Sequence, residues 1–141
     1  MKQVQGVTLV ARGASNHWVT MDGTPEYGGS SAAPSPKELV LMAVAGCTAN
    51  DVIPILAKKK APLQNLEIKV SGVEQEEHPK IFTEIHTEYI FYGEGLNRAD
   101  LERAIELSTT KYCSVHAMLS PGARMTHSYR IVAPQKGVVA D

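Results

Sequence analysis

The feature that most constrains the fold of this chain is a long helical segment that is apolar on almost every side. It begins with a capping-box pattern, in which Ser35 can cap the helix, Pro36 suits its first position and Glu38 follows Ser35 by three residues. The apolar side chains of the segment are Leu39, Val40, Leu41, Met42, Val44, Val52, Ile53, Ile55 and Leu56. A helix of this kind is buried, either at the centre of its own domain or against a partner.

The far end of this helix and the length of the chain lead to a further expectation. Pro54 lies inside the apolar pattern and predicts either a kink or the end of the regular helix. The lysines at 58–60 suit a helix C-terminus. A chain of 141 residues has little other structure with which to cover such a helix. We therefore expect one helix face to meet a second subunit, which makes the protein a homodimer.

Shorter patterns predict the remaining elements. Alternating and β-branched runs indicate strands at residues 4–12, 17–21, 66–73, 80–92 and 125–132. Asn97 is the predicted N-cap of a second helix, and residues 114–119 form a further helical turn. The inner stripe of that second helix is expected to be Leu101, Ile105, Ser108 and Tyr112.

The order of these elements is typical of an α+β fold with antiparallel sheets around a long, central, buried helix. A doubly wound parallel sheet is not expected, because the middle strands follow each other directly. The length suits one domain over residues 1–141, in which residues 134–141 are expected to be a loose tail.

Charge and hydropathy exclude several classes of partner. The net charge is −1 and the pI is about 6.5, so no strong field attracts nucleic acid or an anionic membrane. No uninterrupted apolar run approaches the ~18 residues of a membrane span, and the first residues lack a secretory signal pattern. We therefore expect a cytoplasmic protein in which both cysteines are reduced, rather than joined in a static structural disulfide.

Chemistry in this chain is most plausible at its two cysteines, Cys47 and Cys113. Cys47 lies among the small residues of the apolar helix, which leaves room for another element or a substrate to approach its sulfur. Cys113 ends the second helix, and His116 follows three residues later on the same predicted face. Spacing alone does not pair the two cysteines, and each cysteine taken singly fits the role of a small buried apolar residue.

No motif predicts a cofactor or a metal ion. The chain has no CxxC or HxxxH pair with metal-ligand spacing, and it has no Walker loop, GxGxxG or GxSxG sequence. We expect neither a resident metal nor a bound cofactor.

The contexts of the two cysteines resemble the signatures of a known family. Residues 34–51 run from a Pro-x-Glu-Leu helix start through small and apolar residues to Cys47, and residues 107–116 surround Cys113. Together they resemble the OsmC/Ohr family of thiol-dependent peroxidases over about residues 5–132. The residues before Cys47 and the Thr-His-Ser-Tyr sequence at 126–129 look most like its YhfA-type branch.

The resemblance implies an OsmC-like fold, an intertwined homodimer and a site at each subunit interface. It implies that Cys47 attacks an organic hydroperoxide and that Cys113 resolves the resulting sulfenic acid as a disulfide. An external dithiol of the lipoyl or thioredoxin type would then reduce the pair. The apolar residues Leu39, Val40, Met42 and Val44 are expected to favour an organic substrate over hydrogen peroxide.

A buried thiol needs a partner that stabilises its ionised form. In the peroxidases of this family that partner is an arginine from the N-terminal strands, held by a carboxylate next to the helix-start proline. Arg12 and Glu38 are the corresponding candidates, although Lys37 occupies the position directly after Pro36. That difference keeps two alternatives open: a redox-responsive or small-molecule-binding dimer without efficient turnover, and an interaction protein with merely buried cysteines.

Overall fold

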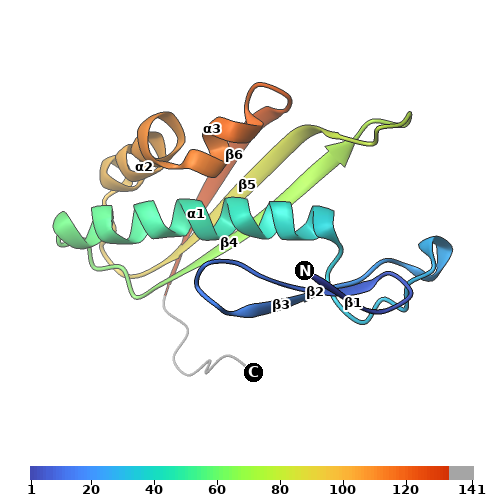
Figure 1. The fold of residues 1–141 in the computed structure, drawn as a ribbon. Coiled ribbons are helices and arrows are strands. Elements are labelled where there is room, and N and C mark those ends of the chain that lie inside the picture. The colour runs from blue at the N-terminus through green and yellow to red at the C-terminus, as the bar shows by residue number, and fades with distance from the viewer. Residues whose placement is uncertain (134–141) are drawn as a thin grey trace. The chain divides into compact units, whose positions relative to one another are not determined.

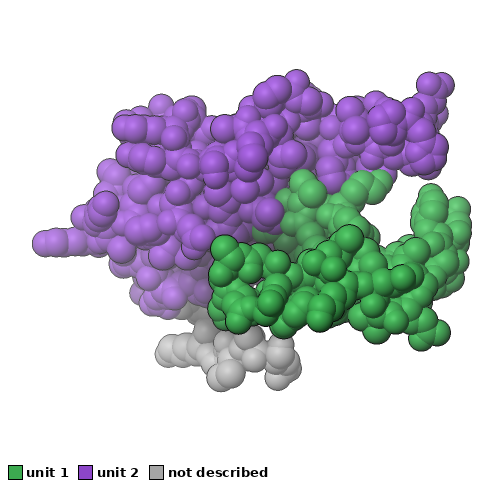
Figure 2. Space-filling view, in the orientation of Figure 1, with its two compact units in different colours: residues 1–42 green, residues 43–141 purple. Residues whose placement is uncertain are grey.

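The computed structural model describes residues 1–133 and divides the chain into two compact units, residues 1–42 and 43–141 (Figure 2). The predicted tail at residues 134–141 lies outside the described residues. Each unit carries its own three-stranded sheet.

The first unit contains an antiparallel sheet in the order β1-β2-β3 (Figure 1). Its elements are β1 (Lys2–Gln5), β2 (Thr8–Arg12), β3 (Trp18–Met21) and the short 3₁₀ turn η1 (Pro25–Tyr27). The single strand predicted at residues 4–12 is in fact split into two. Gly6, with φ of +55°, adopts a left-handed conformation that glycine reaches without steric cost, and the chain reverses there.

The loop after β3 is organised by the buried carboxylate of Asp22. Its Oδ1 accepts hydrogen bonds from the Gly23 N–H and the Thr8 hydroxyl. Its Oδ2 accepts hydrogen bonds from the Ala32 N–H and from both the N–H and the hydroxyl of Ser30. These bonds, led by that from the Ala32 N–H, hold the pKa of Asp22 well below its usual range. The predicted loop is therefore ordered around one charged side chain.

The long helix α1 spans Pro36–Lys58 and starts as predicted. The Ser35 N–H donates to Glu38 Oε2 over 2.7 Å, and the Glu38 N–H donates to Ser35 Oγ over 3.3 Å, which confirms the capping box. The helix continues through Pro54, which excludes an end of the regular helix at that residue, and it stops at Lys58, where the lysines predicted its C-terminus.

Burial on α1 is confined to one stripe of the helix. The buried side chains Val44, Thr48, Val52 and Leu56 recur every fourth residue. Ile53 remains 47% exposed in the single chain, so the chain alone does not bury the helix on all sides. α1 is long and apolar enough to cross a membrane, but the core helix of a soluble protein meets the same criteria of length and hydropathy. Its regular buried stripe is that of a core helix.

The second unit contains a mixed sheet in the order β4-β5-β6 (Figure 1). Its strands are β4 (Asn65–Glu74), β5 (Phe82–Tyr92) and β6 (Arg124–Val132). β4 and β5 pair antiparallel as predicted, whereas β6 runs parallel to β5. The antiparallel expectation is therefore wrong for the last strand. The helices between β5 and β6 form a crossover that brings the chain back to the same end of the sheet.

Helices α2 (Arg98–Leu107) and α3 (Ser114–Leu119) are joined by a π-helical turn, η2 (Ser108–Tyr112). Asn97 caps α2 as predicted, because its side chain accepts a hydrogen bond from the Ala99 N–H over 2.9 Å. Tyr112 is 49% exposed, contrary to its predicted place on the inner stripe. The wider π turn adds residues to the helical repeat and moves Tyr112 off that face.

The core of the second unit lies between α1, α2 and one face of β5. Its fully buried members are Val52, Leu56, Tyr89, Phe91, Leu101, Ala104 and Ile105. This packing fixes α1 against α2, so the helix positions that follow Val44 are held rigidly near the η2 turn.

Candidate functional site

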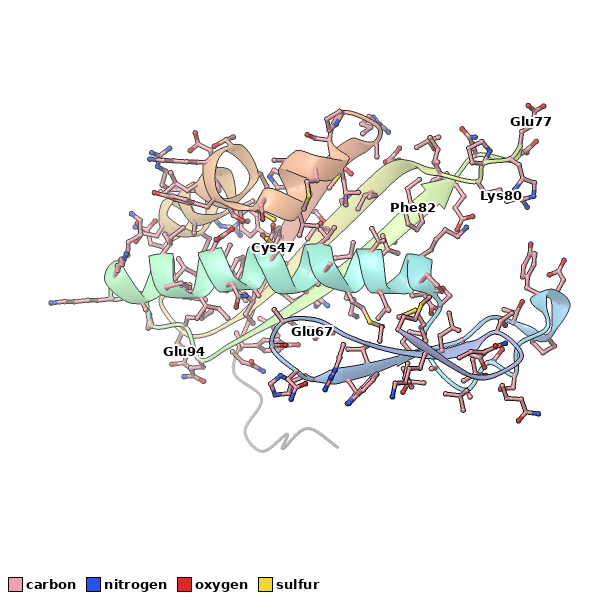
Figure 3. The ribbon with its side chains drawn as sticks, in the orientation of Figure 1. Cys47, Glu67, Glu77, Lys80, Phe82 and Glu94 are labelled. Atoms are coloured by element: carbon pink, nitrogen blue, oxygen red, sulfur yellow. The ribbon has the colours of Figure 1, made fainter. Side chains whose placement is uncertain are left out.

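The first cysteine is placed by α1. Figure 3 shows Cys47 on the side of the helix that faces α2 and α3. Thr48, the next residue, belongs to the buried stripe, and Asp51 follows Cys47 by one helical turn. Residues four apart on a helix share a face, so the Cys47 thiol and the Asp51 carboxylate point to the same region.

The second cysteine is placed by the π turn. The Cys113 N–H donates to the Ser108 carbonyl over 2.9 Å, which closes the η2 turn. Cys113 is then the N-cap of α3, where its sulfur accepts a hydrogen bond from the His116 N–H over 3.3 Å. The Cys113 side chain is only 4% exposed. Its position is thus fixed by hydrogen bonds on both sides of the residue.

The fold brings Cys47 and Cys113 together. The two sulfurs and a carboxylate oxygen of Asp51 all lie within 4.8 Å of one another. Both thiols are free. A disulfide requires the sulfurs to approach to about 2.05 Å. Small side-chain movements therefore separate the observed pair from a covalent one.

The surroundings give the two thiols opposite character. Burial raises the pKa of Cys47, but hydrogen bonds from the Cys113 thiol, the Val115 N–H and the Ser114 side chain outweigh it and lower this pKa overall. Burial and the hydrogen bond to Cys47 raise the pKa of Cys113 to about 11. When the pair loses one proton, the negative charge therefore lies on Cys47 rather than on Cys113.

Asp51 acts against this arrangement. Its negative charge raises the pKa of Cys47, although less than the hydrogen bonds lower it. The carboxylate is held in place by the Ser108 hydroxyl, which donates to Asp51 Oδ2 over 2.9 Å. Asp51 was not predicted as a site residue. Its spacing of four residues from Cys47 is the signal that could have found it.

A chain of buried hydroxyls continues from Asp51 into the core. Thr48 Oγ1 lies 2.9 Å from Ser108 Oγ and 2.8 Å from the Tyr89 hydroxyl. Because the Ser108 hydroxyl donates its proton to Asp51, it must accept a hydrogen bond from the Thr48 hydroxyl. The Thr48 hydroxyl in turn must accept from the Tyr89 hydroxyl. The chain connects α1, β5 and η2, and it fixes the turn on which Cys113 lies.

A small cavity adjoins Cys113 on the side of the sheet. Its lining is mostly hydroxyl and imidazole groups, with Val44 and Met125 as apolar members: Val44, Thr48, Thr87, Tyr89, Thr109, Cys113, His116, Met125, Thr126 and His127. Burial, and then the nearby His127, lower the pKa of His116. Of the four apolar residues expected around the substrate, Val44 lines this cavity, and the other three belong to residues 1–42.

The other two predicted site residues have contacts within the first unit. The Arg12 guanidinium donates to Asn16 Oδ1 and lies 5.1 Å from the centre of the Trp18 ring. Glu38 completes the capping box with Ser35. The hydrogen bond from the Ser35 N–H lowers the pKa of Glu38. The observed contacts of both residues are structural, and their catalytic role stays a prediction.

Comparison with known proteins identifies the family. A family model for OsmC-like proteins matches residues 28–128, a range that includes both cysteines and Asp51. The chain belongs to the OsmC-like family. The predicted resemblance is thereby confirmed, together with the α+β fold.

Relatives of this OsmC-like protein include both close and distant members. It is 42% identical to the protein YhfA of Escherichia coli over 94% of this chain and 96% of that one. A solved structure from structural genomics is 41% identical, has a TM-score of 0.83 and covers 94% of this chain and 96% of its own. An organic hydroperoxide resistance protein from Legionella pneumophila shares the fold at 15% identity, with a TM-score of 0.59 over 92% of this chain and 98% of that one.

Proposed function

We propose that this OsmC-like protein is a cysteine-dependent peroxidase that reduces organic hydroperoxides. The observation that carries the proposal is the adjacent pair Cys47 and Cys113, whose sulfurs lie within 4.8 Å of each other and whose pKa values are shifted in opposite directions. A thiolate next to a protonated thiol is the arrangement that peroxide reduction through a disulfide requires.

The reaction proceeds in two steps on the protein. The Cys47 thiolate attacks the terminal oxygen of the hydroperoxide, the O–O bond breaks, and the alkoxide takes a proton from solvent water and leaves as an alcohol. Cys47 is then a sulfenic acid. The Cys113 sulfur attacks the Cys47 sulfur, its thiol proton joins the departing hydroxide as water, and a disulfide forms. An external dithiol, of the lipoyl or thioredoxin type, reduces the disulfide by exchange.

Family membership supports the substrate class. The Legionella pneumophila relative is named as an organic hydroperoxide resistance protein, and its fold is shared. Val44 and Met125 give the cavity beside Cys113 part of its apolar wall. We propose an organic hydroperoxide as the substrate and a cytoplasmic homodimer as the working form. The exposed apolar side chains Ile53, Tyr112 and Met118 of the single chain are consistent with a covering subunit.

We also propose roles for the two residues of the first unit. Arg12 would stabilise the Cys47 thiolate and Glu38 would support Arg12, as the family resemblance implies. Because Glu38 also caps α1 and Arg12 also contacts Asn16, the test must separate catalysis from folding. Arg12→Ala and Glu38→Gln should lower kcat/KM for the hydroperoxide at an unchanged Tm.

Steady-state turnover tests the proposal. The reduced protein should consume cumene hydroperoxide with dihydrolipoamide or thioredoxin as the dithiol, and it should use hydrogen peroxide more slowly. Cys47→Ser should abolish turnover, whereas Glu94→Gln, an exposed carboxylate in the β5–α2 loop, should leave it unchanged. Consumption no faster than that of Cys47→Ser with either dithiol would remove the peroxidase assignment.

A redox-responsive or small-molecule-binding dimer is the second candidate. The carboxylate of Asp51 beside Cys47 favours it, because its negative charge raises the pKa of Cys47 and so opposes formation of the attacking thiolate. This candidate predicts that one equivalent of hydroperoxide oxidises the pair while no sustained turnover follows.

A further inference from the structure

Asp51 has no role in the two steps of the proposed peroxidase reaction, yet it lies close to both sulfurs and is held there by Ser108. We infer that Cys47, Asp51 and Cys113 form a binding site for one thiophilic divalent cation, of which Zn²⁺ is the best match. The cation would occupy the reduced pair. This inference does not depend on peroxidase activity, since it concerns the resting dithiol.

The distances between the donors suit one metal ion. The three ligand atoms, two sulfurs and one oxygen, all lie within 4.8 Å of one another. Zinc binds sulfur at about 2.3 Å and carboxylate oxygen at about 2.0–2.2 Å, which places tetrahedral ligands about 3.5–3.8 Å apart. Side-chain adjustments of about 1 Å or less would close the site around the ion.

Each donor projects from a fixed element. Cys47 and Asp51 are separated by one turn of α1, the same spacing of four residues that places two ligands on one helix face in helical zinc motifs. Cys113 is fixed between the η2 turn and the first turn of α3. The prediction of no metal site rested on ligand spacing along the sequence. Folding supplies the third donor from residue 113, which spacing does not reveal.

The carboxylate also has the support that a metal ligand needs. The Ser108 hydroxyl donates to Asp51 Oδ2 and fixes the plane of the carboxylate, and Thr48 and Tyr89 in turn hold Ser108. Outer hydrogen bonds of this type orient ligands and typically change metal affinity by about 10–100-fold when they are removed. The buried hydroxyl chain is thus a ready second layer around the site.

Charge and ligand type select the cation. Binding of the ion displaces the thiol protons to solvent, since a coordinated cysteine is a thiolate. Two thiolates and one carboxylate then bring three negative charges together, and a divalent ion offsets most of that repulsion. Thiolates favour zinc and similar soft or borderline ions, whereas Mg²⁺ and Ca²⁺ prefer sites made only of oxygen ligands. Three donors from the chain leave a fourth coordination position for water or another exchangeable ligand.

Cobalt titration of the reduced protein tests the inference, after chelator treatment and under anaerobic conditions. We expect one Co²⁺ per chain, a thiolate-to-cobalt charge-transfer band in the near ultraviolet, tetrahedral d–d bands in the visible range, and displacement by Zn²⁺. Mg²⁺ should not displace cobalt. Binding without the charge-transfer band, or no stoichiometric binding by the wild-type chain, would overturn the inference.

Variants identify the ligands independently of catalysis. Cys47→Ser and Cys113→Ser should each halve the charge-transfer intensity. Asp51→Asn should weaken Zn²⁺ binding more than 10-fold while keeping that intensity, and Ser108→Ala should weaken it about 10-fold. Glu94→Gln is the matched control, since its carboxylate is exposed and lies outside the cluster. Equal Zn²⁺ affinity in Asp51→Asn and Glu94→Gln would remove Asp51 from the site.

Turnover with cumene hydroperoxide is measured separately, on metal-free protein. This measurement tests the peroxidase proposal without reference to metal binding, so the two proposals can fail independently of each other.

Discussion

Replacing Asp51 with asparagine should make Cys47 more reactive. The carboxylate lies within 4.8 Å of the Cys47 sulfur and raises the pKa of that thiol by charge repulsion. Asparagine keeps the shape and an oxygen that accepts the hydrogen bond from Ser108, but it removes the charge. The substitution therefore isolates the electrostatic effect of Asp51.

The magnitude follows from Coulomb's law at this separation. At the upper limit of 4.8 Å, two unit charges repel by about 0.9 kcal/mol at a dielectric constant of 80 and by about 3.5 kcal/mol at 20, and a shorter distance increases both values. Cys47 is only half-buried, so we take the solvent-screened end of this range, about 1 kcal/mol. At a pH below the Cys47 pKa, that energy corresponds to a thiolate fraction about fivefold higher in Asp51→Asn.

The assay is the rate of iodoacetamide labelling of the Cys47 peptide as a function of pH, followed by mass spectrometry on metal-free, reduced protein. Asp51→Asn should label about fivefold faster than wild type at acidic pH, and the two should converge at alkaline pH where both thiols are ionised. Glu94→Gln should label like wild type. Unchanged or slower labelling of Asp51→Asn across the whole pH range would refute the electrostatic reasoning.

Three further predictions concern the resolving thiol, the hydroxyl chain and the loop of the first unit. Cys113→Ser should stop the reaction at a sulfenic acid, seen as a dimedone adduct on Cys47 after one equivalent of hydroperoxide; a rapid return of the free thiol would contradict Cys113 as the resolving residue. Thr48→Val should lower the free energy of unfolding, measured in urea, by about 1–3 kcal/mol, because the buried hydroxyls of Tyr89 and Ser108 each lose a hydrogen bond. Thr109→Val is the control. Equal stability of the two variants would contradict a structural role for the buried hydroxyls. The pKa of Asp22 is lowered in the folded state, so its charge stabilises the fold at pH values above the ordinary pKa of 3.8, and this stabilisation is lost as the pH falls through the folded-state pKa. Asp22→Asn should therefore have a lower Tm than wild type at neutral pH and a smaller fall in Tm on acidification. Tm measured over a series of pH values checks both.

Local sequence signals predicted the parts of the fold that depend on neighbouring residues. The capping box at Ser35 and Glu38 and the cap at Asn97 are formed by side chains that bond to the backbone within three residues. Patterns of that range can be read directly from a chain. The pairing of Cys47 with Cys113 came only through the family resemblance, because no spacing rule joins residues so far apart.

The features that local sequence patterns do not predict are non-local or depend on the exact helical repeat. The direction of β6 is set by the crossover through α2, η2 and α3, and its strand pattern reads the same in either direction. The π turn at η2 has no distinctive composition, yet it determines where Tyr112 and Cys113 lie. The bond between Ser108 and Asp51 joins residues 57 positions apart, and such contacts appear only after folding.

Peptide mass spectrometry shows whether Cys47 and Cys113 form a redox pair. Fully reduced, metal-free protein is treated with one equivalent of cumene hydroperoxide, quenched with an alkylating agent and digested without reductant. We predict rapid loss of two hydrogens from the intact chain and a crosslinked peptide that joins Cys47 to Cys113, both reversed by a dithiol. Two alkylated thiols after prolonged exposure would contradict the claim.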